Sequence, residues 1–289
     1  MKVNGLLHDI AKGQWAMSLE GYMAWAPVAY KILTGKSELP ELEAAKLITF
    51  YGDQGNELMP DEEGAVDVSR GAVAVVNIIG PMIKYGDWCV WGADEISKKI
   101  KGLYADPNIK GIVIVCDGPG GAVGGIPYYK DLARYKNKPL GIVYDTMCSA
   151  HLWGMYAMKP DFVWAANDIS AQVGSMGIMI SLLDNRKYLT ENGISIHDIY
   201  ADESSDKNQP FIQALNGEYD LIKAESLNPL ARKFQSEMLT LRPSLKKEVP
   251  GVITGKVFFT DQALEYGFAD GVGTVEEAIE RVEILSEIN

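Results

Sequence analysis

Ser149 stands where a buried strand is predicted to run into a helix, a position from which a hydroxyl can act as a nucleophile. The apolar run 140–145 predicts the strand, and a helix is expected to begin near Cys148. A serine at such a junction exposes its Oγ beside the free N–H groups of the first helical turn. The same residue type is also a common helix N-cap, so this placement alone does not decide between the two roles.

A glycine loop follows the preceding predicted strand. Residues 109–116 (IKGIVIVC) read as a buried strand, and Asp117-Gly118-Pro119-Gly120-Gly121 comes directly after it. Glycines leave backbone N–H groups open to an anion. The spacing fits neither a dinucleotide fingerprint nor a P-loop, since position 123 is Val123 and residues 251–257 (GVITGKV) lack the required serine or threonine. We therefore interpret the loop as one half of an oxyanion hole facing Ser149.

The base for Ser149 is not expected to be a histidine. The chain has three histidines, and His151 lies two positions after Ser149, which places the two side chains on different faces of a helix. His197 falls in an alternating run, 194–200, that predicts a strand. Cys148 is an alternative nucleophile, but no histidine is suitably spaced to activate it, so we interpret it as a small packing residue.

The elements that position these residues predict an α/β protein with a mainly parallel sheet. Uniformly apolar runs (72–79, 109–116, 140–145) alternate with segments of helical spacing (93–104, 126–135), which indicates strands buried on both faces. Further strands are expected at 161–166 and 176–180, and helices at 182–191, 219–241 and 260–267. The domain prediction is a helical N-terminal extension (1–51), an acidic linker (52–70), a catalytic domain (71–275) and a C-terminal helix (276–289).

Composition limits the partners. The net charge of −12 argues against a nucleic-acid ligand, because affinity for phosphate backbones comes from clusters of Lys and Arg. Three cysteines without a CxxC motif suggest neither a disulfide framework nor a zinc site, and we expect no cofactor and no metal. The longest N-terminal apolar run, 23–30, is too short for a membrane span. We expect a protein of the cytoplasm, including host cytoplasm or a phage prohead.

Four segments, in order, resemble the signal peptide peptidase A (protease IV) family of serine peptidases, which is related to the Clp protease and crotonase folds. They are IKGIVIVCDGPGG (109–121), the helix from Ser149-Ala150 onward, GSMGI (174–178) and the closing stretch 251–273 with TGKV and ALEYGFADG. The sequence departs from the family at Gly118, where serine is usual, and at His151-Leu152, where small and aromatic residues are usual.

The resemblance implies a Ser-Lys dyad on a fold of repeated β-β-α units. Lys207 is the lysine at the matching place, in the polar loop DESSDKNQP (202–210), with Lys223 a distant second. The implied oxyanion donors are the N–H groups of Gly120 or Gly121 and Ala150, and Ser175 is expected to orient the lysine. Related peptidases assemble as rings, so the resemblance implies a homo-oligomer.

The resemblance also implies the substrate. Polypeptides are expected, either as in a bacterial cytoplasmic peptidase or as scaffold-type proteins during phage capsid maturation. Two other functions remain open at this point. One is a crotonase-type enzyme that acts on acyl-CoA thioesters, and the other is a non-catalytic assembly protein with the same fold.

Overall fold

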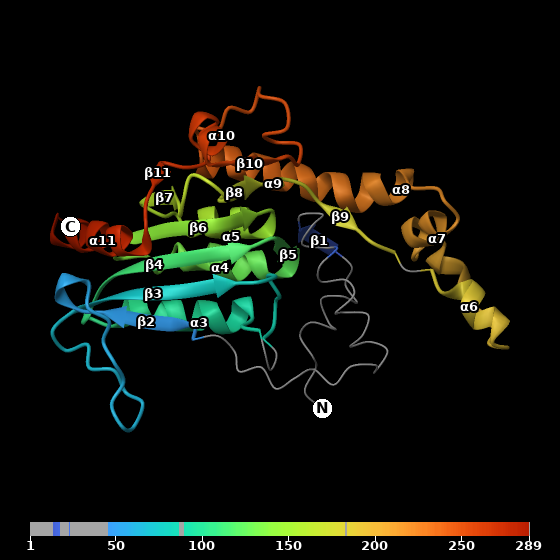
Figure 1. Cartoon of the computed structure of the whole chain (residues 1–289). Coiled ribbons are helices and arrows are strands. Elements are labelled where there is room, and N and C mark those ends of the chain that lie inside the picture. The colour runs from blue at the N-terminus through green and yellow to red at the C-terminus, as the bar shows by residue number, and fades with distance from the viewer. Residues whose placement is uncertain (1–13, 18–22, 24–45, 87–89, 183, 289) are drawn as a thin grey trace.

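A parallel three-stranded core forms the centre of the molecule (Figure 1). The computed structural model describes residues 14–17, 23, 46–86, 90–182 and 184–288. The predicted apolar runs are strands β3 (Ala72–Ile79), β4 (Ile109–Gly118) and β6 (Leu140–Cys148). They lie in the order β6-β4-β3, and both pairs are parallel. The prediction of an α/β fold with a mainly parallel sheet is confirmed.

Shorter strands extend this core on both sides. The C-terminal part of β6 (146–148) pairs with β8, and its N-terminal part (141–144) pairs with β7. The sheet therefore divides at this strand. β2 pairs antiparallel with β3, β10 antiparallel with β8, and β11 parallel with β7. Their bounds are β2 (Ile48–Tyr51), β7 (Phe162–Ala165), β8 (Gln172–Gly174), β10 (Val257–Phe259) and β11 (Gly271–Val272).

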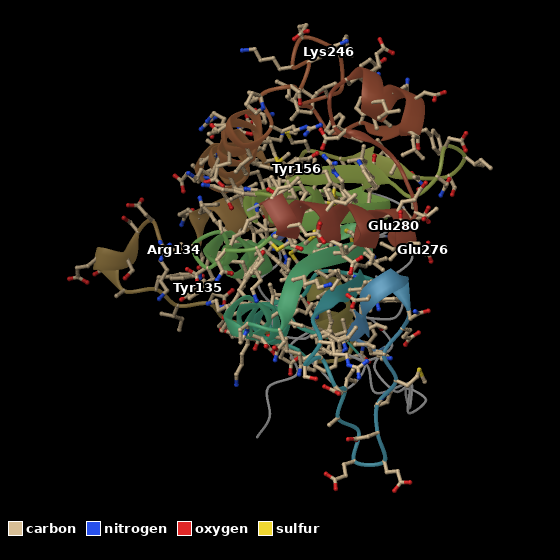
Figure 2. All side chains as sticks on the ribbon, turned by 90° about the vertical axis from the view of Figure 1, so that its left-hand side faces the viewer. Arg134, Tyr135, Tyr156, Lys246, Glu276 and Glu280 are labelled. Atoms are coloured by element: carbon tan, nitrogen blue, oxygen red, sulfur yellow. The ribbon has the colours of Figure 1, made fainter. Side chains whose placement is uncertain are left out.

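Helices cover both faces of the sheet, which is why its strands are apolar without alternation. Successive residues of a strand point to opposite faces. Val73 and Val75 therefore pack against α11 (Val275–Ile288), whereas Ala74 and Val76 face the larger core. That core lies under α3 (Ala93–Ala105), α4 (Ile126–Leu132) and α5 (Ala150–Ala157). The outer face of α11 is polar and carries the exposed Glu276 and Glu280 (Figure 2).

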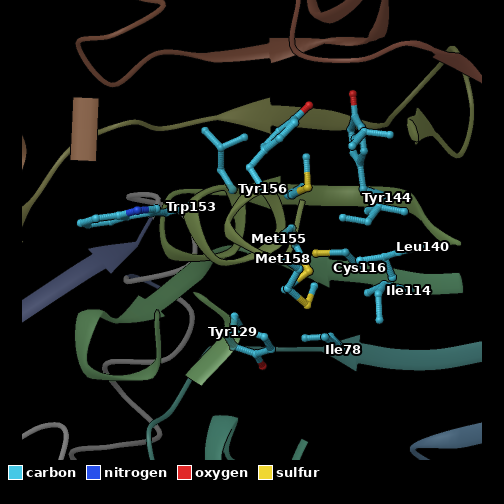
Figure 3. Close-up of a cluster of buried hydrophobic side chains, with 14 of the residues drawn as sticks. Ile78, Ile114, Cys116, Tyr129, Leu140, Tyr144, Trp153, Met155, Tyr156 and Met158 are labelled. Atoms are coloured by element: carbon cyan, nitrogen blue, oxygen red, sulfur yellow. The ribbon is translucent and has the colours of Figure 1, made fainter. Parts of the chain in front are cut away.

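The larger core fixes α5, the helix that follows Ser149. Figure 3 shows Met155 of α5 between Tyr129 of α4 and Tyr144 of β6, next to Met158 at the end of the helix. Every residue of α5 is buried. Trp153 stacks on Phe234 of α9 (Asn228–Leu241), with ring centroids 4.6 Å apart and planes inclined by 7°. Contacts on all sides leave α5 no freedom to shift, so the start of this helix is a rigid support.

Two further parts complete the described chain. A small antiparallel sheet has the order β5-β1-β9, from β5 (Gly120–Ala122), β1 (Gln14–Met17) and β9 (Met179–Ile180). Residues 184–219, called the arm here, project away from the main sheet with α6 (Arg186–Glu191) and α7 (Gln209–Leu215) (Figure 1). The remaining helices are α8 (Asp220–Ile222), which continues through a π turn (Lys223–Leu227) into α9, and α10 (Thr260–Glu265), with 3-10 turns at Asp53–Gly55, Val123–Gly125 and Asp202–Ser204.

Some expected elements are wrong. Helices were expected for residues 1–51, but 14–17 and 48–51 are strands. Met23 is helical, and the rest of that range apart from Lys46 and Leu47 lies outside the described residues, so the prediction is not tested there. Residues 194–200 form no strand, because the arm offers them no neighbouring strand with which to pair. The strand expected at 176–180 is confined to β9, and β8 was not expected. The domain boundaries stay predictions.

Candidate active site

Ser149 occupies a strained turn between β6 and α5. Its backbone has φ 54° and ψ −110°, a conformation that costs a non-glycine residue about 1–3 kcal/mol. Two hydrogen bonds hold it there: the Ser149 N–H donates to the Gly174 carbonyl at 2.8 Å, and the Trp153 N–H donates to the Ser149 carbonyl at 3.0 Å. The hydroxyl makes no helix-capping bond. Ser149 is thus not an ordinary N-cap, and the turn has the strained strand-to-helix geometry of a nucleophile.

The glycine loop lies directly against this turn. A Cβ added to Gly120 would be 2.9 Å from the Ser149 Cβ, and one added to Gly121 would be 2.1 Å from the Met82 carbonyl oxygen. Both glycines also have positive φ, 108° and 153°. The close contacts and the positive φ values together require glycine at both positions. The glycine loop thus lies beside Ser149, as the sequence predicts.

His151 holds the glycine loop in place. Its Nδ1 accepts a hydrogen bond from the Gly120 N–H at 3.1 Å, and its ring occupies the space that a Gly118 side chain would fill, 2.3 Å from the position of such a Cβ. Burial lowers the pKa of His151 to about 4, so the ring is neutral at pH 7. A neutral acceptor turned toward Gly120 is a positioning group for the loop, and sequence reasoning did not find it.

The Ser149 hydroxyl itself is fully buried. The residue has no exposed surface, and its Oγ has no hydrogen-bond partner among the described residues. Ser175 lies beside it through Gly174, at φ 55°, with its N–H donating to the Lys256 carbonyl. The structure therefore brings together Ser149, Gly120, Gly121, Ala150 and Ser175.

Lys207 is not brought to this site within one chain. It is exposed in the turn before α7, where its N–H donates to the Ser204 carbonyl. The helix that follows packs on α8, and Figure 1 shows the arm standing away from α5 and β5. The separation of Lys207 from Ser149 is the main difference between the structure of a single chain and the predicted site.

Other described features do not compete with this site. A pocket of about 530 Å³ lies between α4 and α9, lined by residues that include Lys130 and Glu237, but none of the predicted site residues lines it. Within the described ranges, His, Cys, Asp and Glu form no cluster that could hold a metal ion. Along the same residues, no helix combines the length and the apolar character needed to cross a bilayer.

Comparison with known proteins decides the family. The model for peptidase family S49 matches residues 133–289, which include Ser149, Ser175 and Lys207. The chain belongs to peptidase family S49. The resemblance to signal peptide peptidase A noted from the sequence is thereby confirmed, and the family match covers the Ser149 turn and the arm.

Relatives of known name are distant in sequence. A protein of Methanocaldococcus jannaschii named as a protease is 27% identical over 65% of this chain and 60% of its own length. The head-tail preconnector protein GP5 of Enterobacteria phage P21 is 25% identical over 65% of this chain and 37% of its own length. A protein of Enterococcus faecium named as the signal peptide peptidase SppA is 22% identical over 80% of this chain and 67% of its own length. The chain thus spans 60% or less of the first two relatives.

Solved structures give a weaker likeness. ClpP1 from Listeria monocytogenes has a TM-score of 0.39 at 13% identity, covering 71% of this chain and 94% of that chain. An enoyl-CoA hydratase/isomerase family member has a TM-score of 0.37 at 16% identity, covering 72% and 68%. At these scores the likeness carries no argument about activity.

Proposed function

We propose that this S49 family member is a serine endopeptidase in which Ser149 attacks the peptide carbonyl. The observation that carries the proposal is the strained Ser149 turn with a glycine loop against it. A nucleophile on a rigid turn needs donors placed where negative charge develops. The Ala150 N–H, the first of α5, and the N–H of Gly120 or Gly121 are the donors available there.

His151 affects the choice between the two loop donors. The Gly120 N–H points to His151 Nδ1, so this donor serves an oxyanion only if the bond to the imidazole lengthens or is shared. The ring is neutral and accepts through one nitrogen, so sharing the Gly120 N–H costs less free energy than it would with a charged partner. We assign Gly120 and Ala150 as the pair, with Gly121 structural, because a side chain there would strike Met82.

The base is proposed to be Lys207 of a neighbouring copy. Within one chain this side chain is exposed on the arm, so it meets Ser149 through assembly. The arm is suited to assembly because it exposes large apolar side chains, which monomeric proteins seldom display together. They are Tyr188, Ile194, Ile196, Ile199, Phe211 and Tyr219, of which Ile199 is 91% exposed. Burial at a subunit interface would also remove water from the lysine and favour its neutral form.

In the proposed reaction Lys207 takes the proton of the Ser149 hydroxyl, and Ser175 orients the lysine. The acyl-enzyme that forms is then hydrolysed by water. Substrates are polypeptides, and scaffold-type proteins of a phage capsid are the proposed natural class, supported by the match to a phage head-tail preconnector protein. The oligomer is proposed to be a ring, and its location the cytoplasm or a prohead.

Mixing subunits tests both the nucleophile and the base. Hydrolysis of unfolded casein is expected in wild type, to be lost in Ser149→Ala and in Lys207→Ala, and to be retained in Lys187→Ala, which changes another exposed lysine of the arm. Co-refolding the two inactive variants should restore up to about a quarter of the activity per site if the lysine acts across subunits, since that share of sites pairs intact Ser149 with intact Lys207. Full activity in Ser149→Ala would overturn the proposal, and full activity in Lys207→Ala would overturn only the base.

A further inference from the structure

Strand β1 lies between β9 and β5, and β5 begins at Gly120, the glycine against Ser149. Residues Gln14–Met17 pair antiparallel with β5 on one side and with β9 on the other. The register places Met17 opposite Gly120 and Ala16 opposite Gly121. A short extended segment that completes a sheet between two edges is the way in which many proteins bind a peptide.

The carboxyl end of β1 lies against the same glycine as Ser149. A Cβ built on Gly120 would lie 2.2 Å from the Ala16 carbonyl oxygen, 2.8 Å from the Met17 Cα and 2.9 Å from the Ser149 Cβ. All three atoms therefore surround one glycine. Because β5 starts at Gly120 and β1 runs antiparallel to it, the segment reaches the site with its residues in ascending order toward Ser149.

The same segment closes the site. Ala16 has no exposed surface and Met17 is 7% exposed, while Ser149 is fully buried with an unpartnered Oγ. A buried hydroxyl without a partner costs about 1–3 kcal/mol, so its burial needs an explanation. Strand β1 contributes to this burial, since Met17 and Ser149 lie against the same glycine, Gly120. While β1 occupies the edge of β5, no second peptide can pair there.

The ladder between β1 and β5 ends at Met17, which lies opposite Gly120. The Gly120 N–H donates to His151 and the Ala122 N–H donates to the Met82 carbonyl, so neither of these N–H groups is paired with β1. Alternation along an antiparallel pair then leaves Gly121 facing Ala16. The Ala16 carbonyl belongs to this ladder, and the next carbonyl, that of Met17, is the first one beyond it.

We propose that Gln14–Met17 is the chain's own substrate: it fills the peptide groove, blocks Ser149, and is released when Ser149 cuts the peptide bond after Met17. This inference rests on the proposed peptidase function. It also defines the preferred substrate as an extended peptide with a small residue at the position of Ala16, which has no exposed surface.

The chemistry of the cut is that of the proposed peptidase. The Ser149 Oγ forms a bond to the Met17 carbonyl carbon while its proton passes to the lysine. The C–N bond then breaks, and the leaving amine takes up that proton. Water hydrolyses the resulting ester, which leaves a Met17 carboxylate and restores the Ser149 hydroxyl.

The test compares four full-length proteins: wild type, Ser149→Ala, Ala16→Arg and Ala65→Arg. Arginine cannot be buried at position 16, whereas Ala65 is exposed in the acidic segment and gives a matched control. Uncut wild type and Ala65→Arg should react with a fluorophosphonate probe at the same rate. Ala16→Arg should react about tenfold faster or more, because reactivity scales with the fraction of open sites. Intact mass should show loss of residues 1–17 in wild type with time and not in Ser149→Ala.

Different failures separate the two proposals. Four results would overturn the self-substrate inference: equal labelling of Ala16→Arg and Ala65→Arg, a cut elsewhere, no cut in wild type, or the same cut in Ser149→Ala. If Ser149 is still labelled and the protein still hydrolyses casein, the peptidase proposal is not affected. Absence of labelling and of hydrolysis in all four folded proteins would overturn the peptidase function, and the inference with it.

Discussion

Replacing His151 with glutamine should remove a specific pH dependence of stability. The imidazole is buried, and burial lowers its pKa to about 4 from an ordinary 6.5. In the unfolded chain the His151 imidazole therefore binds a proton near pH 6.5, whereas in the folded chain it binds one only near pH 4. The stabilisation is fully present above pH 6.5 and is lost as the pH falls to 4. The gap of about 2.5 pH units corresponds to about 3 kcal/mol.

Urea unfolding at pH 7 and at pH values down to about 4, the pKa of His151 in the folded chain, measures this difference. The glutamine amide can still accept the Gly120 N–H but does not titrate. The free energy of unfolding of wild type should thus fall by about 3 kcal/mol more than that of His151→Gln across this range. His197→Gln, which changes an exposed histidine, should behave like wild type. Equal pH dependence in wild type and His151→Gln would refute the buried, neutral imidazole.

Two more substitutions test the packing and the strain of the site. Gly118→Ala places a Cβ within 2.6 Å of three His151 ring atoms and should cost about 1–3 kcal/mol, whereas in a His151→Ala background the cost should nearly vanish; equal costs in a double-mutant cycle would contradict the contact. Ser149→Gly relieves the φ of 54° and the unpartnered hydroxyl, so it should raise the free energy of unfolding by about 1–3 kcal/mol while abolishing hydrolysis. Lys159→Gly, at φ 59°, should gain stability and keep activity; if Ser149→Gly is less stable than wild type, the turn is not strained.

Local patterns were enough to predict the sheet and half of the site. The apolar runs of β3, β4 and β6 have no alternation, and only strands covered on both faces read that way. The carboxyl ends of adjacent parallel strands meet at one edge, so Gly120 and Ser149 had to be neighbours once β4 and β6 were paired.

The rest depends on contacts between segments far apart in the sequence. Strand β1 has helical spacing of apolar residues but pairs with β5 and β9, more than 100 residues away, and no local signal reports such pairing. The run 194–200 shows the opposite error: its alternation predicts a strand, and the single chain gives it no partner.

The departures from the family at Gly118 and His151 have one physical cause. The His151 ring fills the space that any side chain at position 118 would need, and it also binds the Gly120 N–H. The two positions are far apart in the sequence, so each departure looked independent. In the structure Gly118 leaves room for the His151 ring, and this ring holds the glycine loop at Gly120.

The most direct measurement of the central claim is the mapping of a fluorophosphonate adduct by peptide mass spectrometry. Ser149 is the residue on the strained turn beside the glycine loop, and we predict a single adduct on the peptide that contains it, absent from Ser149→Ala. An adduct on another serine, or equal labelling of Ser149→Ala, would contradict the assignment of Ser149 as the nucleophile.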